Sequence, residues 1–296
     1  MTENKNTTEL SALISLLDEP DKNMLNQIKE KIYSYGEEAI PILEQAWSTA
    51  INPAIQNRME KIIHQIQKEK LCNAIDTWAR LEKHDLLKGF ILVSQFEYPE
   101  LNAEKISRTL GEIIQEVWLE LNNSLTPLEK IKVINHIIYD IQHFQANKNN
   151  IIAVDNCCLN KVLETRKGNA LSLGILYIII SQALKIPVYG IDLPRHFVLS
   201  YVDEKKEDAP INMLSKKDIL FYINPFYKGV VFSEKEISLF IQQLKIKPED
   251  RFYLPTNNIS IISRLLNELR YTYSKAKRNQ RAKELDKIIS IVQKYH

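Results

Sequence analysis

The sequence predicts a mainly helical protein with a small α+β core, and three observations support that fold class. Only seven glycines occur in 296 residues, whereas strand-rich folds use glycine at many turns. Apolar residues recur at helical spacing through most of the chain. This spacing breaks between residues 156 and 229, where an apolar helix precedes three short segments rich in β-formers.

A helical region is expected over residues 1–145. Apolar stripes begin at Leu10 and Met24, and a third helix begins at Ala39 with a proline in its first turn. The order of a Glu-Pro-Asp turn, two helices and Gly-x-x-Ala-Ile-Pro-x-Leu is similar to a HEAT-type repeat. Two longer helices follow over 103–121 and 127–144. The polar segment 145–150 then marks the boundary to the core.

The core is expected over residues 151–245 and is built around one helix. Residues 170–184 are apolar on almost every side, which is typical of a buried central helix. Lys185-Ile186-Pro187 ends that helix. Strands are expected over 188–193, 197–202 and 219–223, and the charged segment 203–218 is expected to be an exposed loop.

Two further helical features follow the core. Ser233 and Glu236 have the spacing of a capping box, so a helix is expected over 233–244. Helical stripes over 259–276 and 281–295 predict a hairpin within residues 255–296. We expect this hairpin to pack on the core as a cap, with a peptide groove beside it as one option.

Composition and charge exclude several classes of function. Thirty-nine basic and thirty-seven acidic residues are too evenly matched to indicate nucleic-acid binding. The longest largely apolar run, 171–180, is too short to span a bilayer, so no membrane association is expected. Three cysteines without paired spacing favour a reducing, cytoplasmic location. No phosphate-binding loop or set of metal ligands stands out, so no cofactor or metal is expected.

Three separated motifs carry a resemblance to a known family. They are Asn-x-x-Leu-Asn-x-Val-Leu-x-x-Arg-x-Gly-Asn-x-x-Ser-Leu over 156–173, Leu-Pro-x-His-Phe over 193–197, and Asn-Pro-Phe-x-x-Gly over 224–229. Together they resemble the SirB-type transglutaminase-like proteins, whose core is a papain-related α+β fold. The segment 264–269 in the hairpin also resembles the tetratricopeptide-like tail of that family.

This resemblance implies a thiol chemistry that the chain does not fully match. Active members of the superfamily use a cysteine at the start of the central helix, a histidine base on a strand, and an aspartate that orients the histidine. The matching positions are His196 and Asn224, although the SirB-type pattern usually has aspartate before that proline. The family spacing counted back from Lys185 leads to Ala170, and no cysteine follows Cys158. The expected nucleophile is therefore missing.

Other residues near these positions keep alternatives open. Ser172 is the only hydroxyl in the first turn of the central helix, and it is either a weak substitute nucleophile or a helix cap. Cys157 and Cys158 are either a displaced nucleophile or small buried residues at the start of a short helix. His196 is either a base, expected to face the central helix, or a satisfied structural histidine.

Three more residues are candidates for binding. Arg195 precedes His196 and is either a contact for an acidic group or a surface charge. Gly168 and Asn169 lie at the turn before the central helix and complete the expected binding set.

The sequence thus favours a transglutaminase-like protein without the nucleophilic cysteine, acting in regulation or protein interaction with an unknown protein or peptide partner in a bacterial cytoplasm. The alternative is a hydrolase or acyl transferase in which Ser172, or a cysteine, works with His196. A third interpretation is a scaffold whose helical ends bind a partner.

Overall fold

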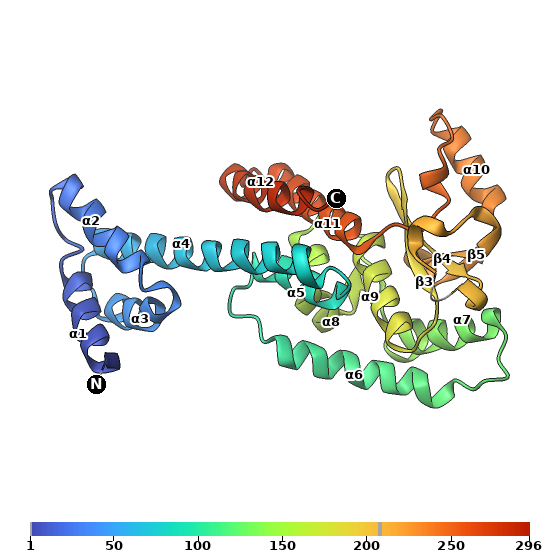
Figure 1. The fold of residues 1–296 in the computed structure, drawn as a ribbon, viewed down its shortest axis with the longest axis horizontal. Coiled ribbons are helices and arrows are strands. Elements are labelled where there is room, and N and C mark those ends of the chain that lie inside the picture. Colours follow the sequence, from blue (N-terminus) through green and yellow to red (C-terminus); the bar gives the residue numbers. More distant parts are fainter. Residues whose placement is uncertain (1, 207–208) are drawn as a thin grey trace. The chain divides into compact units, whose positions relative to one another are not determined.

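The computed structural model describes residues 2–206 and 209–296, with side chains from residue 7 onward. The chain divides into two compact units, Met1–Ala74 and Ile75–His296 (Figure 1). Their boundary lies in the last turn of helix α4 (Pro53–Thr77). The boundary expected near residue 145 lies inside the second unit, and the division into three parts stays a prediction.

The first unit is a helical cluster with its own core. It contains α1 (Thr2–Ser15), α2 (Lys22–Tyr33), α3 (Ala39–Thr49) and most of α4. Asp21 caps α2 by accepting hydrogen bonds from the backbone N–H groups of Asn23 and Met24, at 2.8 Å each. The apolar stripes meet in one buried cluster that includes Leu10, Ile14, Leu17, Ile28, Ile32, Leu43 and Ile62. Any HEAT-like character of this unit stays a prediction.

Helices form the first half of the second unit. They are α5 (Leu86–Gln95), α6 (Ala103–Glu120), α7 (Pro127–Asn135) and α8 (Leu159–Thr165). A π-helical segment, Trp78–Glu82, follows α4, and a second, His136–Ile141, follows α7. The segment expected as one helix over 127–144 is thus helical through Ile141, with its last part π-helical. Thr126 caps α7 in a capping box with Glu129, as the sequence predicted.

The core of the second unit is a central helix packed on a sheet. Helix α9 (Ala170–Ala183) is buried along Leu171–Ser181, which confirms the prediction of a central helix. The sheet has the order β3-β4-β5-β6 and is antiparallel throughout. Strands β3 (Val188–Leu193), β4 (His196–Val202) and β5 (Ile219–Asn224) confirm the three expected strands. Strand β6 (Val230–Phe232) and the short parallel pair β1 (Gln145–Ala146) and β2 (Lys167–Gly168) were not predicted.

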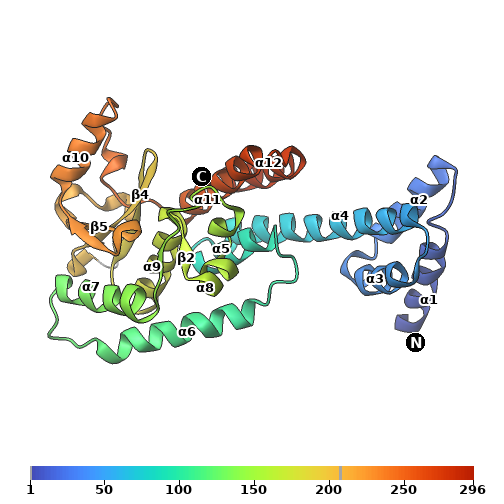
Figure 2. The same cartoon turned by 180° about the vertical axis from the view of Figure 1, so that it is seen from behind.

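The two faces of this sheet pack against different helices (Figure 2). On one face, Phe197 lies against Gly174 of α9, where a Cβ on the glycine would be 2.7 Å from the phenylalanine ring. On the other face, Val198 joins a cluster with Ile237 and Ile241 of α10 (Glu234–Gln243). Consecutive residues of a strand point to opposite faces. His196 and Val198 therefore lie on the α10 side, away from α9.

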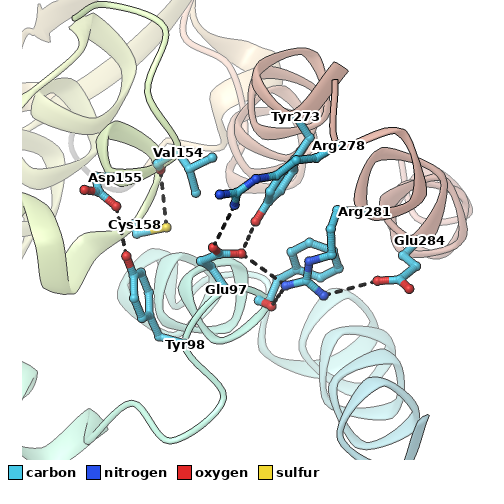
Figure 3. Close-up of polar contacts among 10 residues, drawn as sticks. Glu97, Tyr98, Val154, Asp155, Cys158, Tyr273, Arg278, Arg281 and Glu284 are labelled. Atoms are coloured by element: carbon cyan, nitrogen blue, oxygen red, sulfur yellow. Dashed lines mark hydrogen bonds and ion pairs between the residues drawn. The ribbon is translucent and has the colours of Figure 1, made fainter. Parts of the chain in front are cut away.

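The last two helices, α11 (Asn258–Lys275) and α12 (Asn279–Gln293), pack side by side and are tied to the end of α5. Glu97 accepts a hydrogen bond from the Tyr273 hydroxyl and forms ion pairs with Arg278 and Arg281 (Figure 3). The Arg281 guanidinium also donates to the Phe96 carbonyl at 2.6 Å and lies 4.1 Å from the centre of the Phe96 ring. These contacts hold the pair of helices on the core.

Across the described ranges, 2–206 and 209–296, no helix combines the length and apolar character that crossing a bilayer requires.

The motif at residues 224–229 forms a turn that docks on α7 and α9. Asn135 donates its side-chain N–H to the Gly229 carbonyl at 2.9 Å and accepts from the Tyr177 hydroxyl at 2.9 Å. Tyr139 donates its hydroxyl to the Pro225 carbonyl at 2.9 Å. Gly229 has a φ of +69°, and a Cβ there would overlap the Asn135 side chain. The glycine is therefore required by both backbone conformation and space.

Replacing Gly229 by alanine should lower the free energy of unfolding by about 2–4 kcal/mol, because it strains the backbone and displaces Asn135. Gly111→Ala is the matched control, since that glycine lies in α6 with open space around its Cα. The control should gain about 0.5–1 kcal/mol from better helix propensity. Chemical denaturation of both variants measures the difference, and equal effects would show that Asn135 does not fix this turn.

Candidate functional site

The start of α9 is a closed network of hydrogen bonds. Asn169 is the N-cap and accepts from the Ser172 N–H at 2.8 Å, while the Ser172 hydroxyl accepts from the Asn169 N–H at 3.0 Å. Ser172 is fully buried. A Cβ on Gly168 would lie 2.6 Å from the Ser172 hydroxyl oxygen, so the glycine makes room for this cap. The Ser172 hydroxyl thus serves the helix start, which is the structural alternative that the sequence left open.

Glu268 of α11 joins this network from a distant part of the sequence. Its carboxylate accepts from the Asn169 side-chain N–H at 2.5 Å. Burial raises the pKa of Glu268 above its usual value, and the charge of Arg264 and the Asn169 hydrogen bond offset this only in part. The sequence analysis missed Glu268, because it interpreted the segment 264–269 only as part of a helical repeat.

Cys157 lies beside the same network, and its surroundings disfavour the thiolate. The residue is fully buried, and burial raises the pKa of its thiol well above the usual range. The negative charge of Glu268 acts in the same direction, whereas the Asn169 side chain acts against it. Burial also raises the pKa of the neighbouring Cys158 thiol, which donates to the Val154 carbonyl at 3.4 Å (Figure 3).

His196 and Asn224 line one pocket, but that pocket is on the α10 face of the sheet. Its volume is about 320 Å³. The His196 ring packs edge-on against Phe240 of α10, with ring centres 4.6 Å apart. Partial burial lowers the pKa of His196 below its usual value of 6.5, so the ring is neutral at pH 7. The other residues that line the pocket are Leu193, Val198, Tyr227, Val230, Phe232, Glu236 and Ile237.

The expectation that His196 faces the central helix was therefore wrong. The neighbouring residue, Phe197, takes the position against α9, and strand alternation turns His196 to the opposite face. Asn224 uses its side-chain oxygen to accept from the Phe226 N–H at 3.1 Å, which caps the short 3₁₀ turn Pro225–Tyr227. The structure thus brings His196 and Asn224 to one pocket. The other predicted residues, Gly168, Asn169 and Ser172, lie at the start of α9.

Arg195 lies in the two-residue turn between β3 and β4, and Arg264 of α11 holds that turn. Arg264 donates to the Leu193 carbonyl at 3.0 Å and to the His196 carbonyl at 2.9 Å, and it pairs with Asp192. Arg195 itself is exposed and has a φ of +64°. Sequence reasoning also missed Arg264, although its spacing of four residues from Glu268 places both on one face of α11.

Within residues 2–206 and 209–296, no group of three or more histidine, cysteine or acidic side chains is arranged to hold a metal ion.

Comparison with known proteins decides the family. The model of the transglutaminase-like superfamily matches residues 104–267, which is more than half of the chain. The chain belongs to the transglutaminase-like superfamily. The match runs from α6 into α11, so it includes the central helix, the sheet and the residues Arg264 and Asn267.

The relatives of the chain include the UPF0162 proteins, the SirB-type family that the motifs indicated. A UPF0162 protein of Xylella fastidiosa (strain 9a5c) is 25% identical over 215 residues, which cover 70% of this chain and 72% of the relative. One of Buchnera aphidicola subsp. Acyrthosiphon pisum is 23% identical over 206 residues, covering 68% and 71%. F-box only protein 21 of Homo sapiens is 23% identical over 208 residues, covering 62% of this chain and 32% of the relative. No solved structure matches the chain.

The Glu268→Gln substitution should make the protein more stable at neutral pH. Because the folded state raises the pKa of Glu268, the wild type loses stability as pH rises from about 4.5 through the raised value. Glutamine can still accept from Asn169 and carries no charge, so the variant should be more stable at pH 8 by an amount on the order of 1 kcal/mol, and equal to wild type near pH 4.

Denaturant unfolding across this pH range provides the measurement. Glu112→Gln, at an exposed position of α6, is the control for the removal of one carboxylate. A stability difference for Glu268→Gln that stays constant from pH 4 to pH 8 would mean that the Glu268 carboxyl titrates normally.

Proposed function

We propose that this member of the transglutaminase-like superfamily is a non-catalytic protein that acts in regulation or protein interaction. The observation that carries the proposal is that the candidate base and the candidate nucleophile lie at different places in the fold. The candidate base, His196, packs against Phe240 on the α10 face of the sheet, whereas the thiol of Cys157 lies beside the start of α9. A nucleophile and its base must be within hydrogen-bonding distance to act together.

Each remaining candidate nucleophile is also disfavoured by its own surroundings. A thiol whose pKa is raised by burial is protonated at pH 7 and reacts slowly. The Ser172 hydroxyl is buried, and among the described residues its hydrogen bonds are to the Asn169 backbone, so no base takes its proton. These contacts support a protein that keeps the superfamily fold without its thiol chemistry.

The same features support the cellular setting that we propose. The three cysteines, Cys72, Cys157 and Cys158, are all buried and form no disulfide. Buried cysteines that form no disulfide fit a reducing compartment such as the bacterial cytoplasm. The partner on this proposal is a protein or peptide.

A transamidation assay tests the proposal. Purified protein is incubated with a glutamine-containing protein and a fluorescent primary amine, with an active thiol transglutaminase as the positive control. We expect incorporation equal to that of the His196→Ala and Cys157→Ala variants, because neither residue takes part in a reaction. Labelling by an acylating probe should likewise be unaffected by His196→Ala. Incorporation or labelling that either substitution abolishes would establish an enzyme instead.

A further inference from the structure

A large open groove lies between the β3–β4 turn and the start of α11, within the second unit. Its volume is about 1020 Å³. This is at the upper end of the range of about 300–1,000 Å³ for small-molecule pockets, and it is enough for several residues of a peptide. Apolar side chains supply much of the lining: Leu193, Pro194, Ile211, Leu214, Leu254 and Pro255. Polar groups at its α11 side include Asn257 and Ser260.

One arginine in this groove, Arg195, has no partner carboxylate among the residues that the structure describes. Arg195, Arg251 and Arg264 line it, and among the described lining residues the one carboxylate side chain is Asp192, which pairs with Arg264. Arg251 pairs with Glu249 at 2.8 Å. The Arg195 guanidinium has no hydrogen bond or ion pair to any other residue that the structure describes. An exposed, unpaired guanidinium is suited to bind a carboxylate through two parallel hydrogen bonds.

The position of Arg195 is conformationally unfavourable. It is the second residue of a two-residue turn, and its φ of +64° is in the left-handed region, where glycine is favoured. A non-glycine residue in this region carries a cost that is typically retained at functional positions. Neither hydrogen bonding nor packing of the Arg195 side chain explains its presence, because it is exposed. Six other non-glycine residues of the described chain share the left-handed backbone, so the exposed guanidinium, and not the backbone, distinguishes Arg195 as an anion contact.

The edge of β3 offers backbone groups to the same groove. The Thr256 N–H donates to the Gly190 carbonyl at 2.8 Å on the side of β3 away from β4. Asp192 is two residues further along, so its backbone groups point the same way as those of Gly190. An extended chain segment can therefore continue the pairing that Thr256 begins.

We propose that this groove binds an extended segment of a partner protein that places one acidic side chain on Arg195 and apolar side chains on the groove floor. This inference rests on the proposed function, because it names the class of partner that a non-catalytic member would recognise. The Arg195 guanidinium selects the carboxylate, and the apolar lining selects its neighbours.

The test is a selection from a phage library of random linear peptides against the purified full chain, followed by fluorescence polarisation of the selected peptides. We expect peptides with an aspartate or glutamate flanked by apolar residues. Replacing that acid by its amide should weaken binding at least about tenfold. Arg195→Gln should have the same effect, whereas Arg270→Gln, an exposed arginine of α11 that pairs with Asp286 at 3.3 Å, should have none.

A second variant separates loss of charge from loss of fold. Arg195→Gly removes the guanidinium and relieves the left-handed backbone, so it should keep or raise the Tm and still lose at least about tenfold in affinity. Four outcomes would each overturn the proposal. The selection yields no peptide, or it yields peptides without an acidic residue. The selected peptides bind both Arg195 variants as tightly as the wild type, or inorganic phosphate competes equally well.

These outcomes are distinct from failure of the proposed function. If transamidation depends on His196 and peptide binding depends on Arg195, the non-catalytic proposal is refuted and the peptide-binding proposal stands. If neither transamidation nor peptide binding is detected, the peptide-binding proposal is refuted and the non-catalytic proposal stands.

Discussion

The hydrogen bonds of Asn169 connect the parts of the second unit that decide its chemistry. One side chain caps α9 through Ser172 and holds the carboxylate of Glu268 from α11. A buried carboxylate needs such partners, because burying an unpaired polar group has a large free-energy cost. This arrangement fixes the helix start, occupies the Ser172 hydroxyl, and places a negative charge beside the Cys157 thiol. The charge of Glu268 disfavours the Cys157 thiolate, whereas the Asn169 side chain acts in the opposite direction.

Elsewhere in the second unit, polar residues also hold the family motifs in place through hydrogen bonds. Asn156 is buried and donates to the carbonyls of Asn150 and Ile151 at 2.8 and 2.9 Å, so it fixes the polar segment before the core. Asn135 and Gly229 dock the turn after β5, and Arg264 holds the turn between β3 and β4. All three motifs that carry the family resemblance are thus places where side chains hydrogen-bond to backbone carbonyl groups. These hydrogen bonds give the motif residues a structural role in the fold.

Much of the fold could be predicted from the sequence, because it depends on local periodicity. The apolar run of α9 and the Ile-Pro that ends it fixed one helix, and the Val, Ile, Tyr and Phe segments around it gave β3, β4 and β5. Strand β6 has three residues, which is too few for a period to appear. The π-helical segment after α7 keeps an apolar stripe like that of an α-helix. Its change from α-helical to π-helical hydrogen bonding therefore left no signal in the sequence pattern.

The candidate site was harder to predict, because it depends on which residues face each other across the chain. His196 was assigned correctly to the start of a strand but to the wrong face, since the choice between His196 and Phe197 is made by packing on Gly174. Glu268 is 99 residues from Asn169 in the sequence, and no local pattern connects them. The contacts of Asn169 with Glu268 and of the β3–β4 turn with Arg264 therefore could not be predicted from the sequence, and the roles of the predicted site residues stay predictions.

The rate of thiol alkylation tests the central claim most directly. Native protein is treated with iodoacetamide at neutral pH, and modification of Cys157 and Cys158 is followed by mass spectrometry with and without denaturant. We expect both thiols to react at least about 100-fold more slowly in the native state, at a rate that His196→Ala leaves unchanged, because they are buried and protonated. A fast-reacting native thiol that slows on His196→Ala would contradict the account and identify a working thiol and base.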